Sequence, residues 1–181
     1  MVKRDDDILN IITSDVIKRS IAVSDFSSLD YYGDGTLLGG ILSRSIPIKL
    51  RDGTEIIPAF EAYDVRKKYR NSIEYYRSGK VKSIYLQEPV EIRTQLGLIR
   101  AELITFYEIG VIKKIFPLYG QIGAYWSPEQ ESENAPEAAV TISGITHNLK
   151  IESITLYENG SIRSIDFWEK TKSKRSEKNE H

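Results

Sequence analysis

The chain has no cysteine, and its 181 residues include one methionine and two histidines. The missing cysteines exclude disulfide frameworks, cysteine-ligated zinc, iron–sulfur clusters and thiol catalysis. One histidine is the last residue, which leaves His147 for imidazole chemistry, and we interpret His147 as a turn residue at a position of positive φ. Since the acidic residues are also scattered, we predict a non-catalytic protein with no metal and no cofactor.

The sequence also lacks a long apolar run and an excess of charge of either sign. No stretch approaches the roughly 20 apolar residues that a membrane-spanning helix needs. With 25 basic against 26 acidic residues, the net charge of −1 gives no general attraction for nucleic acid or an anionic membrane. The densest basic and aromatic cluster, FEAYDVRKKYRN at 60–71, could meet phosphates and bases, but we interpret it as a solvated face. We expect a cytoplasmic protein without a membrane or nucleic-acid partner.

Alanine is scarce, with 8 residues, whereas isoleucine contributes 25. Branched and aromatic side chains lose rotamer freedom in helices and fit a pleated, half-buried surface. The composition therefore predicts an all-β fold.

One motif recurs along the chain: a tyrosine, two variable residues, a glycine and then two aliphatic residues three positions apart. The copies lie at 29–41, 73–84, 103–115 and 153–165, with a weak fifth copy at Ile12, Asp15, Ile17 and Ile21. The first copy is looser, because Ile41 comes one place late. A second element recurs between the copies, beginning at Pro47, Pro89 and Val140. The pattern predicts a repeated unit of two hairpins, interrupted by two insertions.

The Tyr-x-x-Gly segment is typical of a three-residue hairpin loop, in which a type I turn is followed by a glycine in the left-handed conformation. We assign this structural role to Gly35, Gly79, Gly110 and Gly160. Counting outward from the second turn pairs Tyr75 with Val81, and an unbroken register then pairs Glu74 with Lys82. The same register puts Ile84, Ile115 and Ile165 on the face of the turn tyrosines, opposite the apolar face that we expect to be buried.

The tyrosines at the turns are the main candidates for binding. Hairpins laid side by side would align Tyr76, Tyr107 and Tyr157 in a ladder on a half-solvated face. The rings either cover the strand ends or contact a partner or ligand. Tyr125 and Trp126, in the insertion that follows the copy with Gly110, are further candidates. Their alternative role is to cap the sheet.

We assign residues 1–168 to one β-hairpin repeat domain, with repeats near 29–60, 73–102, 103–152 and 153–168. Residues 169–181 lack an aliphatic anchor and are predicted to be a disordered charged tail. The first twenty residues fit either a short helix or a degenerate hairpin, and the sequence does not decide between them.

The copies YYRSGKVKSI, FYEIGVIKKI and LYENGSIRSI resemble the units of MORN-like repeat proteins, in particular the bacterial variant grouped with toxin–antitoxin modules. The resemblance covers about 73–168 well and 29–60 loosely. It implies antiparallel hairpins side by side in an open, twisted sheet or a β-solenoid-like stack, with a scaffold or partner-binding role. The chain departs from the usual unit in its double-hairpin period of 31 residues, from Tyr76 to Tyr107.

Three functions stay open at this point. The first is a repeat scaffold or protein-interaction module, with a protein partner or a second copy of the chain on the sheet. The second is a glycan- or small-ligand-binding protein, or a hydrolase, that uses the three tyrosines and Trp126 as stacking platforms beside two converging carboxylates. The third is an antitoxin-like protein that neutralises a specific partner.

Overall fold

The computed structural model describes residues 8–11, 19–50, 52–60, 70–118, 130, 133 and 137–168. Over these residues the chain is all-β and its strands pair antiparallel, which confirms the predicted fold class. The elements are β1 (Ile8–Ile11), β2 (Arg19–Ala22), the 3-10 helix η1 (Val23–Asp25), β3 (Phe26–Tyr31), β4 (Leu37–Leu42), β5 (Ile48–Lys49), β6 (Glu55–Ile56), β7 (Ile73–Tyr75), β8 (Val81–Thr94), β9 (Gly97–Phe106), β10 (Ile112–Phe116), β11 (Glu137–Ile142), β12 (Ile145–Leu156) and β13 (Ile162–Phe167).

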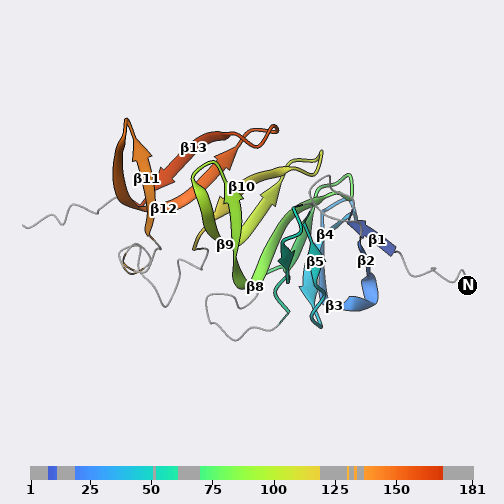
Figure 1. Ribbon diagram of the computed structural model, residues 1–181. Helices are drawn as coiled ribbons and strands as arrows, with labels where there is room; N and C mark the ends of the chain where they lie inside the picture. Colours follow the sequence, from blue (N-terminus) through green and yellow to red (C-terminus); the bar gives the residue numbers. More distant parts are fainter. Residues whose placement is uncertain are drawn as a thin grey trace, which may run out of the picture.

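Four hairpins with the tyrosine turn build one open, twisted sheet (Figure 1). We number these tyrosine hairpins in chain order: hairpin 1 is β3–β4, hairpin 2 is β7–β8, hairpin 3 is β9–β10 and hairpin 4 is β12–β13. The strands run in the order β3, β4, β7, β8, β9, β10, β12 and β13, and β11 pairs with the first half of β12. The sheet therefore ends at β3 on one side and at β13 on the other.

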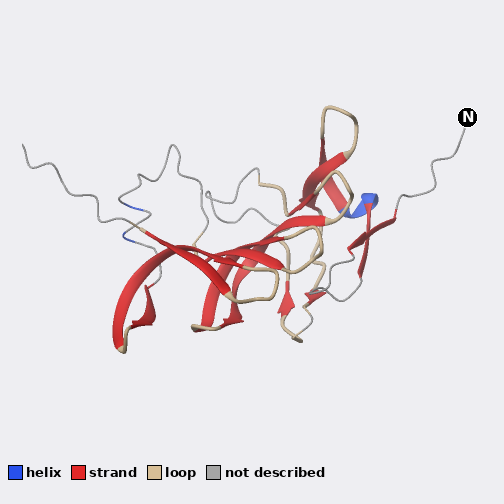
Figure 2. Cartoon of the chain, turned by 90° about the horizontal axis from the view of Figure 1, so that it is seen from above, coloured by secondary structure: helices blue, strands red, loops and turns tan. Residues whose placement is uncertain are grey.

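A second hairpin precedes each tyrosine hairpin, and we call these hairpins the arms. Arm 1 is β1–β2, arm 2 is β5–β6, arm 3 is the outer part of β8–β9 (90–101) and arm 4 is β11 with the first half of β12 (137–150). Figure 2 shows arms 2, 3 and 4 projecting from the same side of the sheet. The repeating unit is therefore an arm followed by a tyrosine hairpin.

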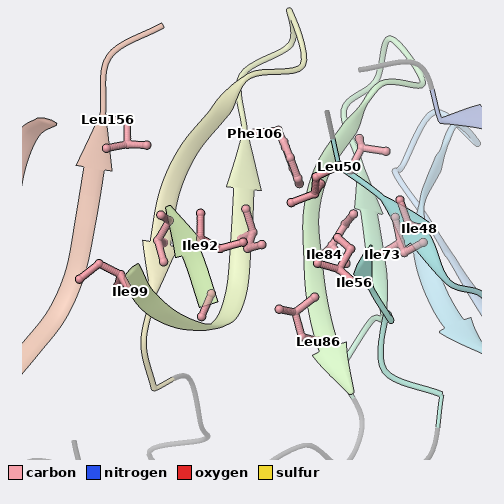
Figure 3. Close-up of a cluster of buried hydrophobic side chains, with 14 of the residues drawn as sticks. Ile48, Leu50, Ile56, Ile73, Ile84, Leu86, Ile92, Ile99, Phe106 and Leu156 are labelled. Atoms are coloured by element: carbon pink, nitrogen blue, oxygen red, sulfur yellow. The ribbon is translucent and has the colours of Figure 1, made fainter. Parts of the chain in front are cut away.

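The arms help to bury the apolar face of the sheet. Ile48 and Ile56 of arm 2 lie against Ile73 of the sheet, and all three side chains are fully buried (Figure 3). Ile92 of arm 3 belongs to the same cluster, which extends to Leu156 in hairpin 4. One continuous core thus runs along all four tyrosine hairpins, from Leu42 in hairpin 1 to Leu156 in hairpin 4, and its apolar burial is the main stabilising term of the fold.

Arm 3 reaches forward along the sheet, to the hairpin after its own. The backbone N–H of Ile162 in hairpin 4 donates to Gln95 Oε1 at the tip of this arm, at 3.2 Å. Leu96 beside it packs against the core. Arm 4 belongs to the last hairpin, and near its tip the side chain of Ile145 is 62% exposed. Arm 4 therefore extends past β13 with an exposed tip (Figure 1).

The tyrosine turns share one hydrogen-bond pattern. In hairpin 2 the N–H of Tyr76 donates to Lys80 O and the N–H of Gly79 donates to Tyr76 O, both at 2.8 Å, and the same two bonds close the other three turns. The glycines at this place, Gly35, Gly79, Gly110 and Gly160, have φ between 79° and 88°. This left-handed conformation strains other L-residues, which is the physical reason for a glycine there.

The pairing departs from the predicted register one residue beyond each turn. Tyr75 pairs with Val81 as expected, but Glu74 pairs with Ser83, because Lys82 is the extra residue of a β-bulge. The predicted pair of Glu74 with Lys82 is therefore wrong as a backbone pair, and hairpins 3 and 4 shift in the same way. Because of this bulge, Ile84, Ile115 and Ile165 lie with the apolar core, so the prediction that they share the face of the turn tyrosines is wrong.

Hairpin 1 uses the same bulge, which explains why its copy of the motif looked displaced. Gly40 pairs with Leu29 at the place that Ile84 occupies in hairpin 2, so Ile41 is not the matching residue. A Cβ at Gly40 would collide with the carbonyl oxygen of Ser28 and with the ring of Phe26. The glycine is needed there because the neighbouring strand and ring approach too closely for a side chain.

One further prediction is corrected. His147 is not in a turn: it lies in β12 opposite Val140, because Ser143 and Gly144, both with positive φ, turn the chain earlier. Ile12, Asp15 and Ile17 of the weak fifth copy lie outside the described residues; the flanking strands β1 and β2 pair Ile11 with Arg19 and form a separate two-stranded sheet. The candidates Tyr125 and Trp126, most of the 60–71 cluster and the 169–181 tail lie outside the described residues.

Candidate interaction surface

The hydroxyl groups of the turn tyrosines join one hairpin to the next. Tyr32 Oη donates to the carbonyl of Tyr75 at 2.8 Å, Tyr76 Oη to that of Phe106 at 2.7 Å and Tyr107 Oη to that of Leu156 at 2.8 Å. In each case the acceptor is the residue just before the tyrosine of the following hairpin. We call this row of bonds the tyrosine ladder.

The ladder completes the pairing between hairpins at the point where the strands stop exchanging hydrogen bonds. Between hairpins 3 and 4 the register includes Ile115 with Ile154 and ends at Lys114 with Thr155. The next carbonyl, that of Leu156, lies beyond this last pair and receives the phenol of Tyr107 instead. A buried or half-buried carbonyl without a donor destabilises a fold, so the ladder replaces a strand bond that the bulge prevents.

Charged side chains surround the rings of the ladder. The guanidinium of Arg77 lies 4.5 Å from the ring centroid of Tyr32 in the preceding hairpin, and it also pairs with Asp34. Burial, and then the carboxylate of Glu108, raise the pKa of Tyr76. The phenol therefore keeps the proton that it donates to the next hairpin across the range of neutral pH.

The last tyrosine has the same construction but a different environment. Tyr157 is 49% exposed, and its hydroxyl meets no acceptor in the described part of the chain. Arg163 lies over its ring, with 5.8 Å between the guanidinium carbon and the ring centroid. The ladder thus ends on an unused donor at the edge of the sheet.

The peptide groups of β13 offer further hydrogen-bonding positions beside Tyr157. Trp168 donates its N–H inward to Lys150 O at 3.1 Å. Because successive peptide groups of a strand point to alternate sides, those of Ile165 and Phe167 point outward, away from β12. Phe167 is also 36% exposed. We define the β13 edge as these outward peptide groups together with the hydroxyl of Tyr157.

A carboxylate anchors this edge to the sheet. Asp166 Oδ2 accepts from Ser153 Oγ at 2.7 Å and lies 3.2 Å from Lys114 Nζ. The hydroxyl of Ser153, and then the ammonium of Lys114, hold the pKa of Asp166 below its usual value. The edge strand is therefore fixed in place by side chains of two neighbouring strands.

Two of the three candidate turn tyrosines, Tyr76 and Tyr107, donate internal hydrogen bonds in the ladder, which favours the packing alternative for them. Tyr157 is the candidate whose polar group is unused. Sequence reasoning left out Tyr32, whose hydroxyl makes the same bond, although it shares the motif. It also left out Tyr31 in β3, at the opposite edge, which is 56% exposed because no strand of the described part of the chain pairs with β3 on its outer side.

Three hollows of about 510, 320 and 200 Å³ lie on the described surface. The largest opens between arms 2 and 3 and the turn of hairpin 4, and Asp52 and Glu158 are among its lining residues. None of the three is lined by Tyr76, Tyr107 or Tyr157. These hollows therefore do not provide the ring-lined groove that the glycan alternative requires.

Within the described ranges, no three His, Asp or Glu side chains gather closely enough to hold a metal ion. The same part of the chain has no helix with the length and apolarity to cross a membrane. No family model, curated protein or solved structure gives a significant match to this chain.

Proposed function

We propose that the protein is a non-catalytic interaction module that takes a β-strand of a protein partner onto the β13 edge. The observation that carries this proposal is the end of the tyrosine ladder. Tyr32, Tyr76 and Tyr107 each donate to the hairpin that follows, and Tyr157 presents the same donor with no following hairpin among the described residues. A strand placed there would supply the missing carbonyl.

The chemistry of strand addition fits this edge. A partner strand gains affinity from main-chain hydrogen bonds and specificity from side-chain contacts along the same strand. The outward peptide groups of Ile165 and Phe167 supply the former, and the exposed ring of Phe167 supplies a contact for the latter. Proteins that avoid edge pairing often place proline, lysine or a bulge on the edge strand; β13 contains neither proline nor lysine, and its bulge, at Arg163, lies next to the turn and before Ile165 and Phe167.

The MORN-like resemblance supports the same proposal, since it implies an open hairpin sheet with a partner-binding role. Membership of that family is part of the proposal.

The test is site-specific photo-crosslinking in cells that express the protein. A photoreactive phenylalanine analogue replaces Phe167 on the β13 edge, and in a matched control it replaces Ile109, which is 52% exposed in the turn of hairpin 3. We expect a crosslinked protein from position 167 and none from position 109. Ile165→Pro, which removes an outward N–H, should abolish the crosslink. Equal crosslinking from both positions, or none from position 167, would refute the proposal.

A further inference from the structure

We infer that the strand on the β13 edge is β3 of a second copy of this chain, so that copies join head to tail and continue the sheet. This inference rests on the proposed function of the β13 edge and names its occupant. It begins from the register between hairpins, which is the same at every junction inside the chain.

At each junction, the residue seven places after one tyrosine pairs with the residue two places before the next. The pairs are Gly39 with Glu74, Ser83 with Thr105, and Lys114 with Thr155. The same rule, applied between copies, pairs Ser164 of one copy with Asp30 of the next. It also pairs Ile165 with Leu29, as Ile84 pairs with Ile104 inside the chain.

The peptide groups at both edges point in the directions that this pairing requires. Gly40 O accepts from Ser72 N–H on the β7 side, at 2.8 Å, so the peptide groups of Gly40 face away from β3. Gly40 and Leu29 are therefore a non-hydrogen-bonded pair, and the N–H and C=O of Leu29 face away from β4. Ile165 also faces outward, so the two residues would exchange hydrogen bonds.

The carbonyl that Tyr157 lacks is present at the other end of the chain. Tyr31 precedes the tyrosine of hairpin 1, as the ladder acceptors Tyr75, Phe106 and Leu156 precede theirs. Those three side chains are 1%, 0% and 6% exposed, whereas Tyr31 is 56% exposed. Tyr31 has the sequence position of a core residue, but in the described part of the chain no preceding tyrosine hairpin covers it.

The side chains at the junction are complementary. Asp30 would lie opposite Ser164 and next to the bulge residue Arg163, which places opposite charges side by side across the new pair. The next copy would also bring the apolar face of its first hairpin toward arm 4, whose tip is exposed. Arm 3 already has this relation to hairpin 4.

Because the two edges differ, the contact is heterologous and each copy keeps one free edge. The tyrosine hairpins of one copy contribute eight strands to the sheet. At about 4.8 Å and 20–25° per strand, each copy would advance the sheet by roughly 38 Å and turn it by roughly 160–200°. Such a repeat extends as an open filament.

The test measures mass against protein concentration by sedimentation velocity. For the wild-type protein, the average mass should keep rising with protein concentration beyond the mass of a dimer. Leu29→Pro blocks the β3 edge and Ile165→Pro blocks the β13 edge, so each variant alone should be monomeric. An equimolar mixture should form a 1:1 dimer and nothing larger. A monomeric wild type, or a blocked variant that still associates alone, would overturn the inference.

A second set of variants tests the register and does not depend on proline. Ser164→Lys places a cation opposite Asp30 and should keep or tighten association, whereas the Asp30→Lys/Ser164→Lys double variant should weaken it at least tenfold. Equal association of the two would overturn the register. Tyr157→Phe, which removes one hydrogen bond, should weaken association about 3- to 10-fold.

The photo-crosslinking experiment separates the two proposals. A crosslink from position 167 to a second copy supports both. A crosslink to a different protein, with the purified chain monomeric, keeps the interaction module and overturns self-assembly. No crosslink overturns both.

Discussion

The tyrosine ladder predicts that two chemically identical substitutions have different effects on stability. Tyr107→Phe removes the phenol that donates to Leu156 O at 2.8 Å and leaves that half-buried carbonyl without its donor. Tyr157→Phe removes a hydroxyl that meets no acceptor in the described part of the chain. The rings, which provide most of the contact area, stay in both variants. The difference between the variants therefore isolates one hydrogen bond.

The expected magnitude follows from that bond. An intramolecular hydrogen bond contributes a net 0.5–1.5 kcal/mol or so, and an orphaned carbonyl adds to the loss. Tyr107→Phe should therefore lower the free energy of unfolding by about 1–2 kcal/mol, and Tyr157→Phe should change it by less than about 0.5 kcal/mol. For a slope of about 2 kcal/mol per molar urea, the first variant unfolds at a midpoint lower by roughly 0.5–1 M.

The assay is equilibrium urea unfolding followed by far-ultraviolet circular dichroism, at a concentration where the chain is monomeric. An unchanged slope shows that the denatured state is the same in all variants. The reasoning is refuted if Tyr157→Phe destabilises the monomer as much as Tyr107→Phe, or if neither shifts the midpoint. Either result would mean that the rings stabilise the sheet by packing alone.

Three further perturbations follow from single residues. Tyr75→Phe should raise the free energy of unfolding by about 1 kcal/mol, because the hydroxyl, whose pKa burial raises, is buried without a partner in the described structure. Tyr76→Phe should instead lower the free energy of unfolding, because it removes a hydrogen bond to Phe106 O. Thermal unfolding checks this opposite sign for neighbouring tyrosines. Gly79→Ala, at φ 79°, should destabilise by about 1 kcal/mol, while Gly33→Ala, with open space around its Cβ, should be nearly neutral in the same urea assay. Asp166 has a lowered pKa in the fold, so its contribution is present above the unfolded pKa of about 3.9 and is lost as the pH falls through the folded value. Urea titrations from pH 7 to pH 3 should show Asp166→Asn less stable than wild type above about pH 5, with the gap closing in acid; a gap independent of pH would contradict this.

The sequence predicts the hairpins well because their turns are local. A tyrosine, two variable residues and a glycine determine a type I turn, and the pair next to the turn, such as Tyr75 with Val81, follows by counting. The apolar pattern then identifies the buried face near the turn. All of this information lies within about ten residues of chain.

The bulges and the ladder lie beyond that range. Val81 and Ile84 are three residues apart, which in a regular strand puts them on opposite faces, and only the extra residue Lys82 brings both to the core. The repeated three-residue spacing of aliphatic residues was the available signal for this bulge. The bond from Tyr107 to Leu156 spans 49 residues, so it depends on how the hairpins are placed next to each other. No local pattern specifies that placement.

The ladder also makes the chain modular in length. Each tyrosine depends on the hairpin that follows it, so deletion of hairpin 4 would leave Tyr107 in the situation that Tyr157 has now. Insertion of one more unit would give Tyr157 its acceptor and pass the unused donor to the new last turn. Gene duplication or loss of a unit can therefore change the length of the sheet while the chemistry of its growing end stays the same.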